Sequence, residues 1–241
     1  MSRTKIIFLG VGMFFLFAFQ TFAQAGELNL TGSGLDQSTF KDLSKELGLA
    51  VSYLPVSPAE PLGIVGFDAG IEVTAASLKS DSFSKVGVSS KTVIIPKLHL
   101  QKGLPFGFDV GVIYSKVPRS NISLLGGELK YAIIAGNVAL PGVAIRTGYT
   151  KLIGVNSLDL STLSADVSVS KGITFVTPYA GVGLVRVTSK EKTGVLNLAE
   201  EKQNLTKGFV GVKVSLAVIN FIFEADFAEI PLYTARFNVG L

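Results

Sequence analysis

The chain has 241 residues, of which 48% are hydrophobic and 17% charged, and it contains no cysteine. Its mean hydropathy of +0.48 is high for a soluble protein. Disorder requires low hydrophobicity and high charge, so this composition excludes it. The lack of cysteine excludes disulfide and cysteine-based zinc frameworks. The small formal charge of +4 argues against nucleic-acid binding, which concentrates positive charge on one face. The composition leaves two classes of protein: a membrane protein, or a soluble chain with an unusually apolar surface.

The N-terminus has the three parts of a secretory signal peptide. Arg3 and Lys5 supply positive charge, an apolar run follows over residues 6–22, and a small-x-small cleavage site comes next. We therefore expect residues 1–25 to be removed. The alternative is a membrane anchor, since about 20 apolar residues can cross a bilayer. The residues at the expected cleavage site are Ala23, Ala25 and Gly26.

From Leu62 onward, apolar and polar residues alternate, which predicts β-strands with two different faces. In the segment 67–75, every odd position is apolar, while Asp68 and Glu72 occupy even positions. No later apolar run reaches the roughly 18 residues that a membrane helix needs. Ten alternating segments are predicted, at residues 62–78, 91–102, 105–116, 122–135, 141–154, 158–170, 177–190, 205–218, 220–229 and 232–241.

The lengths of these segments indicate a membrane barrel. Strands of soluble proteins average about 5–6 residues, whereas a tilted transmembrane strand needs about 9–11. An even strand number, short inner turns and longer outer loops are features of outer-membrane barrels. With the first strand running outward, the outer loops are 79–90, 116–121, 154–157, 189–204 and 229–231, and the inner turns are 102–104, 136–141, 171–177 and 219–220. We predict an all-β fold: an antiparallel transmembrane β-barrel of about ten strands over residues 62–241.

Aromatic residues gather near the predicted strand ends, as in the girdles at the two membrane interfaces. The alternative is a soluble β-sandwich with an aromatic core, which would leave ten strands to close without edges. The inner girdle would contain Phe106, Phe108, Tyr131, Phe175, Tyr179, Phe221 and Phe223, and the outer girdle Tyr114, Tyr149, Phe209 and Tyr233.

Together these features resemble the small outer-membrane β-barrel proteins of Gram-negative bacteria. The resemblance covers the signal peptide and residues 62–241, and it is one of architecture rather than of a specific motif. It implies outer-membrane lipid as a partner, and a last strand that carries a signal for the barrel-assembly machinery. The residues that match this alternating signal are Tyr233, Phe237, Val239 and Leu241, although Leu241 stands where Phe is usual.

Residues 26–61 do not alternate and form a separate segment before the barrel. Asp36 or Ser38 can cap a short helix that ends near Leu47, with Gly48 as its stop. A helix is about 10–12 Å across, and a lumen lined by charges leaves little room for it. We therefore expect a periplasmic helix at or across the inner mouth; a plug inside the barrel and a plain tether are the alternatives. The prolines that favour an extended lead-in after the helix are Pro55, Pro58 and Pro61.

The face opposite the apolar one is expected to line the lumen, and its charges are of mixed sign. A selective pore favours a ring of one sign, whereas mixed charges in a narrow barrel are expected to pair, because unpaired buried charges are costly. This favours a mostly closed, salt-bridged interior, while inward glycines keep a narrow polar channel as the alternative. Arg186 and Lys213 also fit the opposite phase of strand alternation, in which their side chains would face outward. The predicted lumenal residues are Asp68, Glu72, Lys97, His99, Asp109, Glu128, Lys130, Arg146, Asp166, Arg186, Lys213, Glu224, Asp226 and Arg236.

Catalysis has little support, because His99 is the one histidine and every histidine-based mechanism would have to use it. We expect His99 near the inner end of its strand, paired with Asp109 and out of reach of the outer rim. We predict no catalytic residue, no metal site and no cofactor. The predicted function is a narrow porin-like channel or small-solute passage protein. The alternatives are a non-conducting structural or surface-contact barrel and, third, an outer-membrane hydrolase. Any surface or periplasmic partner is left unspecified.

Overall fold

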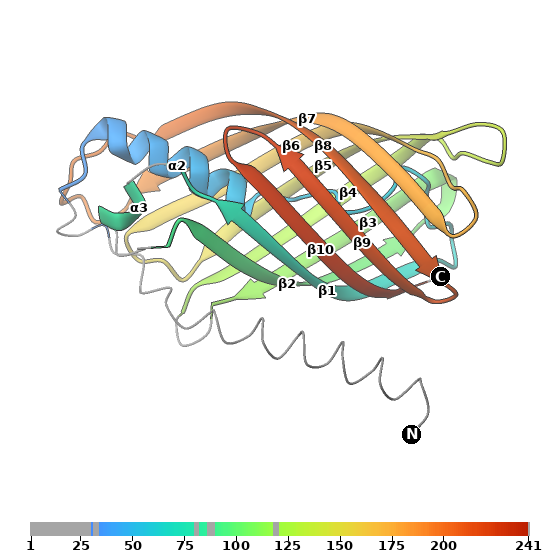
Figure 1. The fold of residues 1–241 in the computed structure, drawn as a ribbon. Coiled ribbons are helices and arrows are strands. Elements are labelled where there is room, and N and C mark those ends of the chain that lie inside the picture. The colour runs from blue at the N-terminus through green and yellow to red at the C-terminus, as the bar shows by residue number, and fades with distance from the viewer. Residues whose placement is uncertain (1–29, 31–33, 80–81, 86–89, 118–120, 241) are drawn as a thin grey trace, which may run out of the picture.

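The computed structural model describes residues 30, 34–79, 82–85, 90–117 and 121–240 (Figure 1). The expected cleavage site at Ala23, Ala25 and Gly26, and the terminal Leu241, lie outside the described residues. The elements in chain order are α2 (Gln37–Val51), β1 (Phe67–Ser77), α3 (Ser82–Lys85), β2 (Thr92–Gly103), the short helix η2 (Pro105–Gly107), β3 (Phe108–Lys116), β4 (Ser123–Ile134), β5 (Gly142–Ile153), β6 (Leu158–Ser170), β7 (Val176–Glu191), β8 (Glu201–Leu216), β9 (Ile219–Phe227) and β10 (Pro231–Gly240).

The strands form one closed antiparallel barrel, in which sequence neighbours pair and β1 also pairs with β10. Closure leaves no strand edge exposed. We call the end that carries the β1–β2, β3–β4, β5–β6, β7–β8 and β9–β10 connections the loop end. The opposite end, where β1 begins and β10 ends, is the turn end (Figure 1). The prediction of a ten-stranded antiparallel barrel is confirmed.

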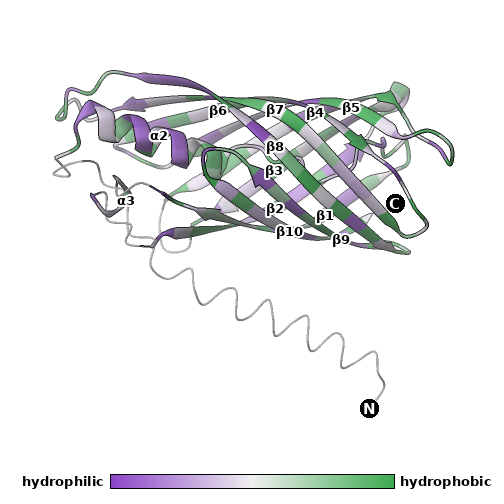
Figure 2. Cartoon of the chain, turned by 45° about the horizontal axis from the view of Figure 1, so that its top comes forward, coloured by the Kyte–Doolittle hydropathy of each residue, from purple (hydrophilic) through white to green (hydrophobic). Residues whose placement is uncertain are grey.

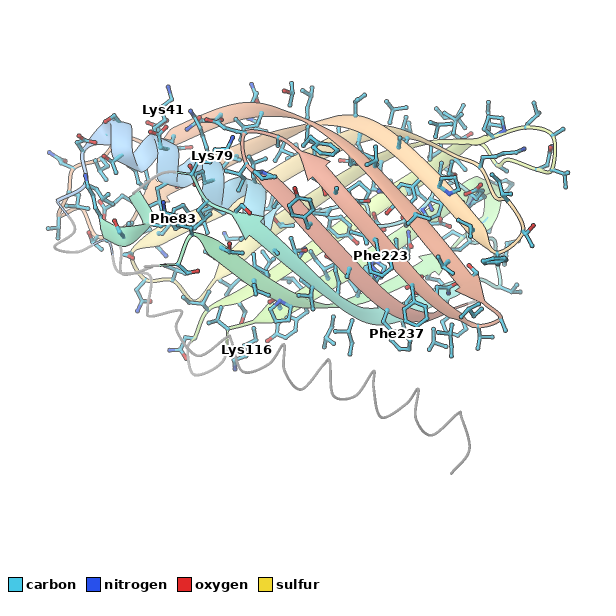
Figure 3. The ribbon with its side chains drawn as sticks, viewed as in Figure 1. Lys41, Lys79, Phe83, Lys116, Phe223 and Phe237 are labelled. Atoms are coloured by element: carbon cyan, nitrogen blue, oxygen red, sulfur yellow. The ribbon has the colours of Figure 1, made fainter. Side chains whose placement is uncertain are left out.

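Alternation along each strand separates an apolar outer face from the interior. In β3, Val110 and Val112 are 37% and 51% exposed, whereas Asp109 and Ile113 are 0% and 2% exposed. Figure 2 shows the resulting change of hydropathy from residue to residue along the strands, and Figure 3 shows Phe223 and Phe237 on β9 and β10. Among the described residues, no helix is long and apolar enough to cross a bilayer.

Predicted and observed boundaries differ most at the start of β1 and in the loop between β7 and β8. β1 begins at Phe67 rather than at Leu62, because Gly63 has a φ of +76° and its carbonyl accepts a hydrogen bond from the Gly66 N–H at 3.0 Å. The loop predicted at 189–204 is shorter, because β7 and β8 remain paired as far as Ser189 and Glu201. Only residues 192–200 connect the two strands.

Helix α2 begins with Asp36 as its N-cap, where the carboxylate accepts a hydrogen bond from the Thr39 N–H at 2.7 Å. This agrees with one of the two predicted caps. Gly48 does not stop the helix, which continues to Val51. A side chain at Gly48 would meet that of Val187, which points inward from β7. The glycine therefore allows the helix to pack closely against the inner wall of the barrel.

Helix α2 enters the barrel at the loop end, and residues 52–66 continue through the lumen to the start of β1. At the mouth, the Gln37 side chain bonds to the Ala199 carbonyl, and Lys45 pairs with Glu229 at 3.2 Å. Residues 46–51 are buried. The prediction of a helix at or across the inner mouth is therefore wrong, and the plug that was an alternative is what the structure contains.

The interior has two zones. In the loop-end half, inward residues such as Leu160, Val187 and Leu232 form an apolar core with Phe40 and Leu43 of α2. In the turn-end half, the inward residues are mostly polar or charged. A lumen lined by charges was expected to leave little room for a helix; in the structure the charges occupy the turn-end half, and α2 fills the apolar loop-end half.

Candidate functional site

The candidate functional site is the turn-end half of the lumen together with the segment that passes through it. Among the predicted lumenal residues, Lys213 points inward and is partly exposed, and Arg186 points outward and is exposed. The prediction for Arg186 is wrong. The remaining predicted residues are all buried inside the barrel: Asp68, Glu72, Lys97, His99, Asp109, Glu128, Lys130, Arg146, Asp166, Glu224, Asp226 and Arg236.

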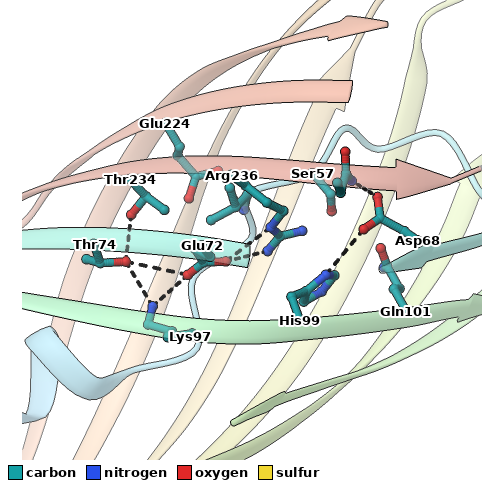
Figure 4. A network of polar contacts seen from close by, with 12 residues as sticks. Ser57, Asp68, Glu72, Thr74, Lys97, His99, Gln101, Glu224, Thr234 and Arg236 are labelled. Carbon is teal, nitrogen blue, oxygen red and sulfur yellow. Dashed lines mark hydrogen bonds and ion pairs between the residues drawn. The ribbon is translucent and has the colours of Figure 1, made fainter. Parts of the chain in front are cut away.

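One charge cluster spans β2, β1 and β10 and is centred on Glu72 (Figure 4). Strand register places Lys97 and Arg236 directly opposite Glu72 on its two sides. The Glu72 carboxylate lies 2.7 Å from Lys97 Nζ and 2.7 Å from an Arg236 nitrogen. Lys97 also donates to the Thr74 hydroxyl at 2.9 Å, and Thr74 contacts Thr234 at 3.0 Å. Cross-strand pairing therefore holds one carboxylate between two cations.

A second cluster runs across β3 to β6 in one row. Register sets Asp109 opposite Lys130, Lys130 opposite Arg146, and Arg146 opposite Asp166. The ion pairs are Lys130–Asp109 at 2.8 Å and Arg146–Glu128 at 3.1 Å, with Asp166 at 4.0 Å from Arg146. The two cations lie side by side in the middle of this row, with a carboxylate at each end, and the Glu128 carboxylate lies beside Arg146.

This second cluster also binds the N-terminal segment. Lys130 donates to the carbonyls of Pro58 and Glu60 at 3.3 and 3.0 Å. Arg146 donates to the Ser57 hydroxyl at 3.1 Å. These bonds satisfy backbone groups that would otherwise be unpaired inside the barrel. The lumenal charges therefore hold the segment as well as one another.

A third cluster lies on β7, β8 and β9. Lys207, which the sequence analysis missed, pairs with Asp226 at 3.4 Å. Glu224 accepts hydrogen bonds from the Tyr179 hydroxyl and from the Val56 N–H, both at 2.8 Å. Lys207 has the same odd-numbered phase as Lys213, so strand alternation could have found it.

His99 lies in the lumen 3.4 Å from Asp68. The predicted partner, Asp109, is occupied by Lys130 and by the Leu62 N–H at 3.1 Å. Neither ring nitrogen of His99 has a hydrogen bond to another described residue. His99 is 3% exposed, so it is shielded from solvent at either mouth of the barrel. Among the described residues, no group of His, Cys, Asp or Glu could hold a metal ion.

Tyr53 fills the centre of the lumen and is 1% exposed. Its ring lies over two inward glycines: a Cβ added at Gly148 would be 2.7 Å from Tyr53 Cβ, and one at Gly111 would be 3.0 Å from the hydroxyl. Inward glycines kept a narrow polar channel as the alternative prediction. In the structure, the space beside Gly111 and Gly148 is occupied by Tyr53.

Two aromatic residues assigned to the membrane girdles point inward instead. Tyr179 and Phe209 are 4% and 1% exposed, and their ring centroids lie 6.4 Å apart. Added Cβ atoms at Gly211 and Gly181 would collide with their rings. These small inward positions allow two large rings to pack within the barrel.

Asp36 and Lys45 lie where α2 enters the barrel at the loop end, and their hydrogen bonds shift their pKa values. The Thr39 side chain and backbone N–H donate to Asp36 and lower the pKa of its carboxyl to about 2. The hydrogen bond to Glu229 raises the pKa of Lys45. The ionised Asp36 therefore caps the start of α2, and the ionised Lys45 holds the helix to Glu229 of the barrel.

No protein-family model and no curated protein sequence matches the chain. Solved structures do match in architecture. The N-terminal β-barrel domain of Pseudomonas aeruginosa OprF is 12% identical with a TM-score of 0.35, and the match covers 74% of this chain and 99% of that one. The translocator domain of the autotransporter NalP from Neisseria meningitidis is 9% identical, with a TM-score of 0.39 and coverage of 73% and 87%. The attachment invasion locus protein Ail of Yersinia pestis is 13% identical, with a TM-score of 0.35 and coverage of 75% and 97%. This chain is similar to outer-membrane barrels in its type of fold.

Proposed function

We propose that this chain is an outer-membrane β-barrel that its own N-terminal segment keeps closed, with a structural or surface-contact role. The observation that carries the proposal is the course of residues 37–66, which run through the lumen from the loop end to the turn end. Placement in the outer membrane is supported by the closed barrel, its apolar outer face and the expected signal peptide. The contact surface would be the loop end, where α2 and residues 192–200 lie together.

The lumenal ion pairs support a closed barrel. A conducting pore needs a path along which water and ions move past weakly bound groups. Here Glu72, Asp109 and Asp226 each lie within 3.4 Å of a buried cation. The segment then covers the centre of the lumen with Tyr53, which is 1% exposed. Neither these paired charges nor the space around Tyr53 is free for passing solutes.

Current recordings in planar lipid bilayers test this proposal. We expect the folded full-length protein to give no current steps at any voltage. Heat-modifiable gel migration of the same sample checks that the barrel is folded. Regular current steps from folded protein would overturn the closed-barrel proposal.

Engineered cysteines test the threaded segment directly, because the chain has none of its own. Ser52 is fully buried and Ser38 is exposed in the same segment. We expect a water-soluble maleimide to label S38C quickly and S52C only after unfolding. Equal labelling of the two variants in folded protein would mean that the segment does not occupy the lumen.

A narrow channel is the second candidate. The observation that favours it is a polar hollow of about 490 Å³ at the turn end, lined by residues that include Glu60, Asp68 and Lys213. Such a hollow could admit solutes if the segment moved. A hydrolase ranks third, because His99 is buried in the lumen, 3.4 Å from Asp68, and lies away from the loop-end surface.

A further inference from the structure

Arg186 is a cation on the face of the barrel that lies against lipid. It is exposed on β7, and its neighbours on the same face, Leu163 and Leu184, are 52% and 57% exposed. It has no ion pair with another described residue. A charge on this face is costly unless it reaches the headgroup region. A cation here without an ion-pair partner therefore suggests that Arg186 binds an anionic group from outside the chain.

Strand register places Arg186 two strands away from an exposed tyrosine on the same outer face. Arg186 is opposite Leu163, and Leu163 is opposite Tyr149. Tyr149 is 49% exposed and belongs to the aromatic residues toward the loop end. Tyrosine on an outer face is typical of a membrane interface, and an interface at Tyr149 would bring the Arg186 guanidinium within reach of lipid headgroups.

More cations continue from Arg186 toward the loop end on the outer face of β5 to β8. Lys151 pairs with Asp159 at 3.6 Å, and Lys202 pairs with Glu200 at 3.0 Å. Lys190, like Arg186, has no ion pair with a described residue. We call Lys151, Arg186, Lys190 and Lys202 the basic rim. It has four cations against two carboxylates, so it favours an anionic partner.

An apolar groove of about 710 Å³ lies directly below the basic rim. Its small floor residues are Thr147 and Ala165, and its walls include Tyr131, Ile145 and Leu184. The Thr147 hydroxyl donates to the Ser164 carbonyl at 3.1 Å, which satisfies the polar group in the floor. Leu184 is two residues from Arg186, or about 6.6 Å along the strand. The groove therefore suits an acyl chain whose headgroup lies at Arg186.

We propose that the outer face of β5 to β8 binds an acylated, phosphate-bearing lipid of the outer leaflet. Its phosphate contacts Arg186 and Lys190, and one of its acyl chains lies in the groove over Ala165. Charge complementarity at the rim and the apolar groove below it select this lipid over a free anion or a neutral lipid. The inference rests on the proposed membrane placement, with the loop end outward, and it does not depend on whether the lumen is closed.

Native mass spectrometry of the full-length protein in detergent tests the site. The probes are a bisphosphorylated, multiply acylated glycolipid and the same lipid without its phosphates. The variants are R186Q with K190Q, which removes charge, and A165L, which fills the groove. The matched controls are K116Q, on the rim of β3, and A235L, on the outer face of β10.

We expect the wild type to bind the phosphorylated lipid more tightly than the dephosphorylated one. Each removed rim charge should weaken binding roughly fivefold, and A165L should weaken binding of both lipids. The controls should bind as the wild type does. The proposal would be overturned if the wild type bound the two lipids equally. It would also be overturned if K116Q and A235L lost as much lipid-binding affinity as the variants at the proposed site. Heat-modifiable migration and the need for detergent test membrane placement separately, so failure of the lipid site is distinguishable from failure of the proposed function.

Discussion

Replacing Glu72 by Gln should destabilise the barrel more than the loss of any surface ion pair. The substitution keeps the size of the side chain and removes the charge that lies 2.7 Å from both Lys97 and Arg236. The side chains of both cations are 0% exposed, so water cannot replace the carboxylate. Breaking a buried ion pair by removing one partner costs about 3–5 kcal/mol. We expect a loss of that size in the free energy of unfolding.

Urea unfolding of the folded protein, followed by far-UV circular dichroism and by gel migration, measures this loss. The matched control is D159N, which breaks the exposed Lys151–Asp159 pair, whose side chains are 49% and 43% exposed. A surface pair contributes about 0–1 kcal/mol. The triple replacement E72L, K97M and R236M should cost less than E72Q alone, because no buried charge is left unpaired. If E72Q cost no more than D159N, the Glu72 cluster would not have the role assigned to it.

Three further predictions concern the N-terminal segment. Gly148→Val should displace Tyr53 and increase protease cleavage of the segment, and Tyr53→Ala should suppress this effect; cleavage unchanged in G148V would contradict the packing of Tyr53 over the glycine. The pKa of Asp36 is lowered from 3.8 to about 2, so its cap is complete above about pH 4 and is lost as the pH falls through about 2; a carboxyl titration followed by NMR should have its midpoint near 2, and a midpoint near 4 would refute the cap. Gly48→Leu should prevent α2 from packing on the wall and should make an engineered Cys at buried Ser44 reactive, whereas Ser44→Cys alone should stay protected.

Strand alternation predicted the barrel well because a residue's face depends only on its parity within a strand. It placed Glu72, Lys97 and Arg236 in the lumen, but it could not show that register sets them opposite one another. Arg186 was assigned to the wrong face because β7 has Val185 and Val187 inside and Leu184 outside. In such a strand apolar residues occupy both faces, so the pattern does not reveal which one is inward.

The face that an aromatic side chain occupies was predictable only in strands whose inward and outward positions were already clear. Tyr179 lies near the turn end of β7, as girdle residues do, and Phe209 lies in the middle of β8, yet the parity of both residues places them inside. The structural reason is that Gly211 and Gly181 make room for their rings. These glycines lie on neighbouring strands and face the rings only through the register, which the sequence does not show.

The position of the N-terminal segment follows from a change in polarity along the inner wall of the barrel, from apolar at the loop end to polar at the turn end. On β6, the inward residues Leu158 and Leu160 are apolar, whereas Ser164 and Asp166 in the same phase are polar or charged. Inward leucines facing water would forgo about 1.5–3 kcal/mol each, so the loop-end half requires an apolar occupant. Helix α2 supplies one, with Phe40, Leu43 and Leu47 in the same core.

The polar half has the complementary requirement. Lys130 and Arg146 donate to the N-terminal segment as well as pairing with carboxylates: the carbonyls of Pro58 and Glu60 accept from Lys130, and the Ser57 hydroxyl accepts from Arg146. An empty barrel would therefore expose leucines at one end and leave cations under-bonded at the other. Since the same continuous segment meets both needs, the barrel and its N-terminal segment stabilise each other, and we expect them to unfold as one unit.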